Sequence, residues 1–178
     1  MARNKGVDLW SLDECHFQQH GTRCRMWIPP EDKDPIVLQA PTRKSVAVFG
    51  AVNTETGKLV TMLAPRFNAE TFETFLCKLI RHRKRSGKMV IILDNARYHH
   101  AVLLKELLRK YRKTMILDFL PPYSPDLNPI ERVWKFLRKK CTHNQYFETL
   151  TDLLHAVEIE VEAWKKPNNA LSKLCGII

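Results

Sequence analysis

The stretch Ser124-Pro125-Asp126-Leu127-Asn128-Pro129-Ile130-Glu131 places a carboxylate at the start of a helix, immediately after a rigid turn. Its prolines restrict φ, and the Asp and Asn beside them favour turns. Pro129 stands where a helix tolerates proline best, at its first position. Apolar side chains then recur at 130, 133, 134 and 137, the spacing of one buried helical stripe. Glu131 lies beside this stripe, so we expect its carboxylate at the rim of a buried sheet edge.

Two roles for Glu131 follow from these residues. A rigidly aimed acid beside a core is what a metal site needs. Glu131 is also at N3 if Asn128 is the N-cap, and N3 is the capping-box position of an ordinary helix. The residues alone leave both roles open.

Hydrophobic patterns predict a group of strands first and then alternating helices and strands. Strands are predicted over 7–12, 23–28, 45–52, 58–64, 88–94 and 115–120, with a five-residue hairpin loop over 53–57. Helices are predicted after the N-cap residue Asn68, over 99–111, from 130 and over 150–164. The helix over 99–111 is expected to turn Val102, Leu103, Leu107 and Leu108 inward. This order predicts an α/β fold, a mixed sheet with antiparallel first strands and helices on both faces.

Length and cysteine content narrow the class of protein. At 178 residues the chain has the length of one domain, which we assign to residues 1–178. Five cysteines without a C-x-x-C pair argue against a disulfide framework and against a zinc ribbon. Reduced thiols, the lack of a signal peptide and the lack of any apolar run near ~18 residues predict a cytoplasmic protein with no membrane partner.

The charge of the chain indicates a polyanionic partner. Lys and Arg number 29 against 19 acids, which gives a net charge of +10, and nucleic acid is the first candidate. Each basic cluster falls at the end of a predicted helix, where cations also complement the helix dipole. The candidate DNA-binding residues are Arg81, Arg83, Lys84, Arg85, Arg109, Lys110, Arg112, Lys113, Arg138, Lys139 and Lys140.

Three acids stand at predicted strand or helix ends, namely Asp13, Asp94 and Glu131. Sites in open α/β sheets gather beyond the carboxyl ends of parallel strands, where the first two acids would converge. Grouped carboxylates need compensation, and Mg²⁺ prefers oxygen ligands. Two ions would suit phosphodiester chemistry. A solvated turn at Asp94-Asn95 is the plainer alternative, and Asp13 and Glu14 point to opposite strand faces, so only one of them can face the site.

Three motifs in order resemble the catalytic region of mariner-superfamily transposases, most strongly the bacterial insertion-sequence branch. They are Leu12–Phe17 (LDECHF), Leu93–His99 (LDNARYH) and Leu120–Trp134 (LPPYSPDLNPIERVW), and 36 residues separate Asp94 from Glu131. The resemblance implies a ribonuclease H-like fold and a DDE triad of Asp13, Asp94 and Glu131 that holds Mg²⁺ or Mn²⁺, as two ions. Glu14, Asn95 and His99 would then be neighbours of the active site.

The same resemblance implies an activity and partners. Family members cut transposon ends and join the 3′ hydroxyls to target DNA, typically at TA dinucleotides, in dimeric or higher synaptic assemblies. The first catalytic strand starts by about residue 7. We therefore expect a DDE catalytic domain without the family's N-terminal helix-turn-helix region, in the bacterial cytoplasm and associated with the nucleoid.

The function expected from the sequence is metal-dependent DNA cleavage and strand transfer. One alternative is a catalytically silent DNA-binding or oligomerisation module that acts with a separate helix-turn-helix chain. Another is a general nuclease for RNA–DNA hybrids. Cleavage assays in Mg²⁺ or Mn²⁺ separate the three.

Overall fold

A central sheet of mixed strand direction organises the part of the chain that the structure describes. This computed structural model describes residues 6–25, 27–31, 36, 38–84 and 87–176. The strands are β1 (Val7–Gln18), β2 (Ser45–Asn53), β3 (Leu59–Ala64), β4 (Lys88–Leu93) and β5 (Met115–Phe119). They lie in the order β3-β2-β1-β4-β5. β1, β2 and β3 pair antiparallel, and β1, β4 and β5 pair parallel, so the predicted mixed sheet is confirmed.

Strand β1 is longer than its parallel neighbour, and this difference opens the place where the acids gather. β4 pairs with β1 only as far as Ser11↔Ile92, whereas β2 accompanies β1 to Gln18. The sequence predicted a strand over 7–12 with Asp13 at its end. β1 instead continues to Gln18, so Asp13 lies within the strand. It still stands just beyond the carboxyl end of the parallel pair, because β4 stops first.

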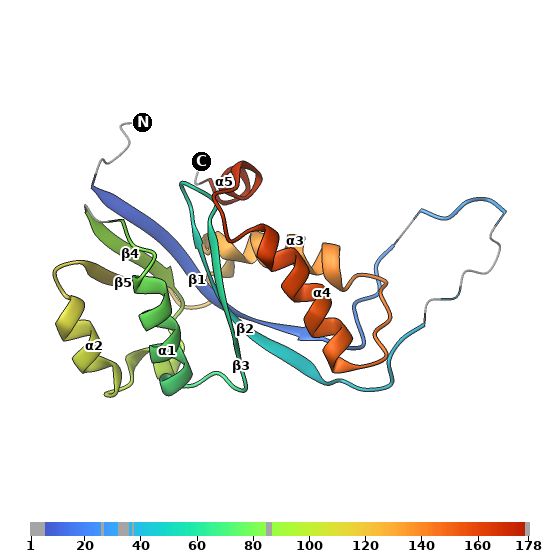
Figure 1. Cartoon of the computed structure of the whole chain (residues 1–178), viewed down its shortest axis with the longest axis horizontal. Helices are drawn as coiled ribbons and strands as arrows, with labels where there is room; N and C mark the ends of the chain where they lie inside the picture. The colour runs from blue at the N-terminus through green and yellow to red at the C-terminus, as the bar shows by residue number, and fades with distance from the viewer. Residues whose placement is uncertain (1–5, 26, 32–35, 37, 85–86, 177–178) are drawn as a thin grey trace.

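Helices cover both faces of the sheet (Figure 1). α1 (Ala69–Ile80) and α2 (Leu104–Tyr111) pack on one face with Trp10 and Leu12 of β1. α3 (Ile130–Cys141), α4 (Leu150–Ala163) and α5 (Asn169–Cys175) pack on the other face with Cys15 and Phe17. Even-numbered residues of this part of β1 thus face α1, and odd-numbered residues face α3, as the two-residue period of a strand requires.

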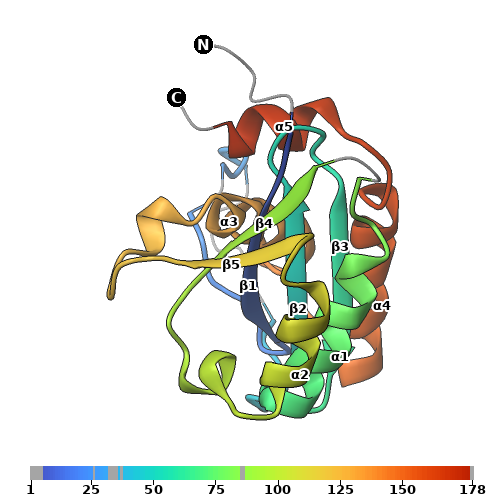
Figure 2. The same ribbon diagram turned by 90° about the vertical axis from the view of Figure 1, so that its left-hand side faces the viewer.

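The helices begin in different ways. Asn68 caps α1 in a capping box with Thr71, so the predicted cap is confirmed, and Thr149 caps α4 in the same way with Asp152. α3 has Pro129 as its N-cap and no side-chain cap among its own turn residues. The prediction of Pro129 as first helical residue is therefore wrong, and Asn128 is not the N-cap that the capping alternative for Glu131 required. The turn after β5 leads directly into this helix (Figure 2).

Two other predictions from local pattern are wrong. No strand forms over 23–28, where Met26 lies outside the described residues, and the nearest pairing is an isolated bridge between Thr22 and His143. The helix expected over 99–111 is split into a 3₁₀ turn, η1 (Arg97–His100), and α2, because the backbone is extended at Ala101. Val102 and Leu103 consequently lie exposed, while Leu107 is buried as predicted.

Candidate active site

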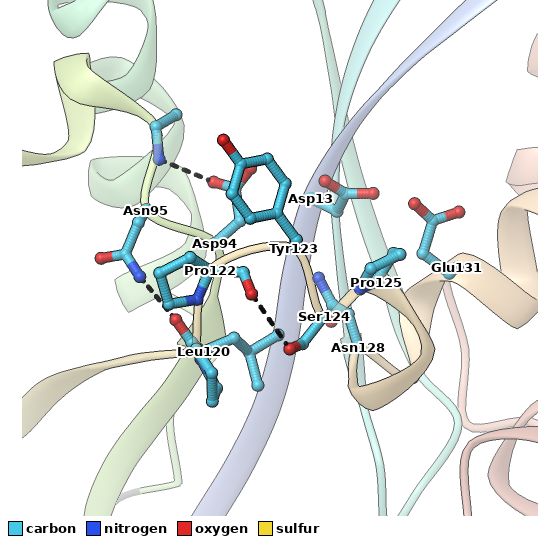
Figure 3. A pocket seen from close by; sticks show the side chains of 12 residues that line it. Asp13, Asp94, Asn95, Leu120, Pro122, Tyr123, Ser124, Pro125, Asn128 and Glu131 are labelled. Atoms are coloured by element: carbon cyan, nitrogen blue, oxygen red, sulfur yellow. Dashed lines mark hydrogen bonds between the residues drawn. The ribbon is translucent and has the colours of Figure 1, made fainter.

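The three acids of interest line one open cleft of about 450 Å³ at the carboxyl ends of β4 and β5. Asp13, Asp94 and Glu131 share this cleft with the Pro121–Pro125 turn (Figure 3). Asn95 and Asn128 complete its polar lining. In Figure 3, Asp94 and Glu131 lie on either side of Asp13. Three carboxylates from three separate segments of the chain therefore face one volume.

Asp13 is fixed by a contact with α3. The indole Nε1 of the fully buried Trp134 donates a hydrogen bond of 3.1 Å to Asp13 Oδ2. The ring comes this close because the strand opposite has no side chain there: Gly50 pairs with Asp13, and a Cβ on Gly50 would lie 2.3 Å from the ring. Gly50 is thus required for close approach of α3 to the sheet.

Glu131 enters the cleft from the first turn of α3. Its backbone N–H donates to the Asn128 carbonyl oxygen at 3.1 Å, and its side chain does not close a capping box. An acid in the first helical turn also complements the helix dipole. The capping role left open by the sequence is therefore not the one Glu131 has.

Glu14 lies on the opposite face of β1, beside η1. His99 is buried, and its Nε2 lies 3.1 Å from Glu14 Oε1 while its Nδ1 lies 3.1 Å from Asp94 Oδ1. One ligand atom from each of Glu14, Asp94 and His99 lies within 4.8 Å of the others, so these residues also form a group able to hold a cation. Asp94, which is largely exposed, thus borders both groups of acids.

Burial and like charge dominate the electrostatics of the cleft. Burial, followed by the charges of Glu14, Glu131 and Asp94, raises the pKa of Asp13 to about 8. Burial and the adjacent Glu14 carboxylate also raise the pKa of Tyr98. Mutually repelling carboxylates in one cleft form an oxygen donor set that a divalent cation would stabilise, so the residues fit a hard metal ion.

Asn95 and Asn128 both link segments at the cleft. Asn95 donates from Nδ2 to the Leu120 carbonyl oxygen, which joins the ends of β4 and β5. Asn128 contacts Ser11 and Leu12 of β1. Ser11 and Trp134 were not among the residues expected at the site. The available signal was a serine inside an apolar strand and an indole N–H on a buried helical stripe, since buried polar groups are paired as a rule.

The basic residues divide into exposed and inward-facing groups. Arg138 donates from Nη2 to Cys15 Sγ at 3.0 Å, so this guanidinium is engaged with β1. Lys84 pairs with Glu55 at 2.6 Å, Arg83 is half-buried, and Arg85 lies outside the described residues. The exposed cations at the ends of α1, α2 and α3 are Arg81, Arg109, Lys110, Arg112, Lys113, Lys139 and Lys140.

A family model and several known proteins match most of this chain. A family model described as DDE superfamily endonuclease matches residues 8–154. The chain belongs to this family. The Tc3 transposase of Caenorhabditis elegans is 31% identical over 97% of this chain and 55% of its own length. A 39 kDa protein of insertion element IS630 from Shigella sonnei is 27% identical over 61% of this chain and 31% of its own length. The family member described here is thus a mariner-superfamily DDE domain.

Solved structures with low sequence identity share the fold. A Mos1 transposase paired-end complex matches with a TM-score of 0.65 and 20% identity, over 93% of this chain and 50% of that chain. The catalytic core domain of BIV integrase matches with a TM-score of 0.53 and 18% identity, over 86% of this chain and 82% of that chain. The expected ribonuclease H-like fold is therefore confirmed.

Two further facts bound these comparisons. The chain spans about half the length of the Tc3 and Mos1 transposases that it matches. In the described part of the chain, no helix has the length and apolar character needed to cross a bilayer.

Proposed function

We propose that this chain is the catalytic part of a transposase that cuts DNA at transposon ends and joins the freed 3′ hydroxyls to target DNA, at TA sites. The observation that carries the proposal is the shared cleft of Asp13, Asp94 and Glu131. Membership of the DDE endonuclease family and the likeness to Tc3 transposase support it.

Asp13, Asp94 and Glu131 would hold two divalent ions, Mg²⁺ or Mn²⁺. Mos1 paired-end complexes with Mg and with Mn are among the structures of similar fold. When bound, the ions supply Lewis acidity for in-line attack at a phosphodiester and for departure of the 3′ oxygen. The ionised carboxylates would orient the ions, and Trp134 holds Asp13 in position by its hydrogen bond.

The protein around the cleft would bind the DNA backbone. Exposed cations stand at the ends of α2 and α3, such as Arg112 and Lys139, in a chain of net charge +10. Neutralising phosphates with these side chains makes binding strongly dependent on salt. We further propose that the chain works in a homodimer or larger synaptic assembly, with a helix-turn-helix region that recognises the transposon ends. In this proposal the protein acts on nucleoid DNA in the bacterial cytoplasm.

Plasmid nicking in Mg²⁺ and in Mn²⁺ tests the proposal, with the wild type compared with Asp94→Asn. Asp118→Asn is the matched control, because Asp118 is an exposed acid of β5 that does not line the cleft. We expect nicking by the wild type and Asp118→Asn and none by Asp94→Asn.

Equal nicking by Asp94→Asn would contradict the assignment of the site. Salt-sensitive DNA binding without nicking in either metal would instead support the catalytically silent module. Preferential cleavage of an RNA–DNA hybrid over duplex DNA would support the general nuclease.

A further inference from the structure

A small hydrogen-bond network joins β1 to the turn that precedes α3. The Ser11 hydroxyl donates to Asn128 Oδ1, and Asn128 Nδ2 donates to the Leu12 carbonyl oxygen at 3.1 Å. The Ile130 backbone N–H donates to Ser11 Oγ at 2.9 Å. Ser11 is 0% exposed and Asn128 is 4% exposed, so water does not compete for these bonds.

Every group in the network has a defined role as donor or acceptor. The single hydroxyl proton of Ser11 goes to Asn128, which leaves its lone pairs for Ile130. Rotating the Asn128 amide by 180° would set its oxygen against the Leu12 carbonyl oxygen. The network therefore has one arrangement, and buried bonds of this kind rigidify the segments that they join.

Ser11 also supplies what α3 lacks. The first N–H groups of a helix have no partner inside the helix, and the turn before α3 offers no side-chain cap. Ser11 caps Ile130 from a strand that lies more than a hundred residues away in the sequence. The strand that carries Asp13 thus also holds the start of the helix that carries Glu131.

The network lies close to both Asp13 and Glu131 along the chain. Ser11 and Asp13 are two residues apart on one strand and point to the same face. Asn128 and Ile130 lie three residues and one residue before Glu131. Few rotatable bonds therefore separate the network from either carboxylate.

We infer that Ser11 and Asn128 are positioning residues that set the separation of the Asp13 and Glu131 carboxylates and thereby the affinity of the site for a divalent cation. The inference rests on the proposed function, because it takes these two acids as ligands of one site. Groups that orient metal ligands from behind commonly change metal affinity or activity by about 10–100-fold when they are removed.

The test measures binding of Mn²⁺ alone to the full chain, by electron paramagnetic resonance of free Mn²⁺ and by calorimetry, without DNA. Ser11→Ala and Asn128→Ala each remove part of the network. We expect each to weaken Mn²⁺ binding about tenfold or more. The double variant should bind about as weakly as the weaker single variant, because the two side chains act as one unit.

Asn53→Ala is the matched control. Asn53 is 2% exposed, and its amide donates to Asp8 and accepts from the backbone of Thr56, away from the cleft. It should lower the melting temperature without changing Mn²⁺ affinity. Melting temperatures of all variants, recorded by circular dichroism, keep loss of folding apart from loss of affinity.

The outcomes distinguish the inference from the proposed function. Wild-type Mn²⁺ affinity in both Ser11→Ala and Asn128→Ala would overturn the positioning role while leaving the metal site intact. Affinity lost equally in Asn53→Ala would also overturn it, because the effect would then follow stability alone. Absence of Mn²⁺ binding and of nicking in the wild type would overturn the proposed function itself.

Discussion

The two faces of β1 hold neighbouring acids in different ways. On the α3 face, Asp13 is contacted by the neutral indole of Trp134, and the start of α3 is tied down by Ser11 and Asn128. On the opposite face, Glu14 is contacted by His99, which also reaches Asp94. Adjacent residues of one strand thus contact an indole on one side and an imidazole on the other.

This difference suits the two acids to different proposed roles, Asp13 as a metal ligand and Glu14 as part of the support. Asp13 has no cationic partner among these contacts to offset its burial, so its charged form is disfavoured and its pKa rises to about 8, and a bound cation would stabilise that charged form. Glu14, in contrast, already has the buried imidazole of His99 as its partner. We therefore expect the α3 face to dominate metal binding and the η1 face to orient Asp94.

Glu131→Gln is the largest expected loss on the α3 face. Removing one of the proposed anionic ligands should lower metal-dependent nicking by more than about a hundredfold, since even supporting groups cost about 10–100-fold. The melting temperature should change by less than about 2 °C, because the Glu131 side chain does not cap α3. Plasmid nicking and thermal unfolding measure the two effects.

Glu14→Gln is the matched change on the other face. It leaves the α3 network intact and should cost less than Glu131→Gln does. A loss as large as that of Glu131→Gln would contradict the expected dominance of the α3 face in metal binding. It would instead indicate that the ion binds at the group of Glu14, Asp94 and His99.

The free energy of unfolding should depend on pH because of Asp13 on the α3 face. Asp13 has a pKa near its ordinary 3.8 in the unfolded chain and about 8 in the metal-free fold. Between these values the folded state holds a proton that the unfolded state lacks, so stability falls as pH rises. We expect a loss on the order of a few kcal/mol from pH 5 to pH 8 in EDTA, which Asp13→Asn removes.

Urea unfolding at several pH values measures this slope, with Asp118→Asn as the control that should keep it. Parallel pH profiles for the wild type and Asp13→Asn would contradict the assigned cause. Added Mn²⁺ should flatten the wild-type profile, because binding a cation expels the Asp13 proton.

Gly50→Ala tests how closely α3 must approach. The new Cβ would lie 2.3 Å from the buried Trp134 ring, so we expect a loss of about 1–3 kcal/mol in the free energy of unfolding. Displacing the ring also weakens its hydrogen bond to Asp13, so nicking should fall as well. Gly6→Ala, where a Cβ meets nothing within 4 Å, should change neither quantity.

The sequence predicted what depends on local pattern. Alternation and turn residues predicted the hairpin of β2 and β3, and Asn68 predicted the start of α1. The prediction of one continuous helix over 99–111 was wrong. Apolar residues keep a helical spacing through this segment, and that spacing does not show that the backbone is extended at Ala101.

Long-range partners were beyond the reach of local pattern. Asn128 fitted the N-cap of its own helix equally well, yet its amide is used by Ser11 and Leu12, 117 and 116 residues away. Alternation along β1 showed that Asp13 and Glu14 face opposite sides. Only the packing of α3 against Gly50 decides that the Asp13 side is the one with Glu131.

The smallest expected effect is on the salt dependence of DNA binding, and it should differ between two neighbouring cations at the end of α3. Lys139 is exposed, whereas Arg138 reaches Cys15 on the α3 face of β1. Lys139→Ala should reduce the dependence of log DNA affinity on log salt by about one unit and leave the melting temperature unchanged. Arg138→Ala should instead lower the melting temperature, because it leaves the buried side of β1 without its contact.

DNA binding titrated from low to physiological salt measures the effect of Lys139→Ala. If Arg138→Ala alone changed the salt slope, its guanidinium would have to leave Cys15 to meet phosphate, and the α3 face would be less rigid than its hydrogen bonds indicate.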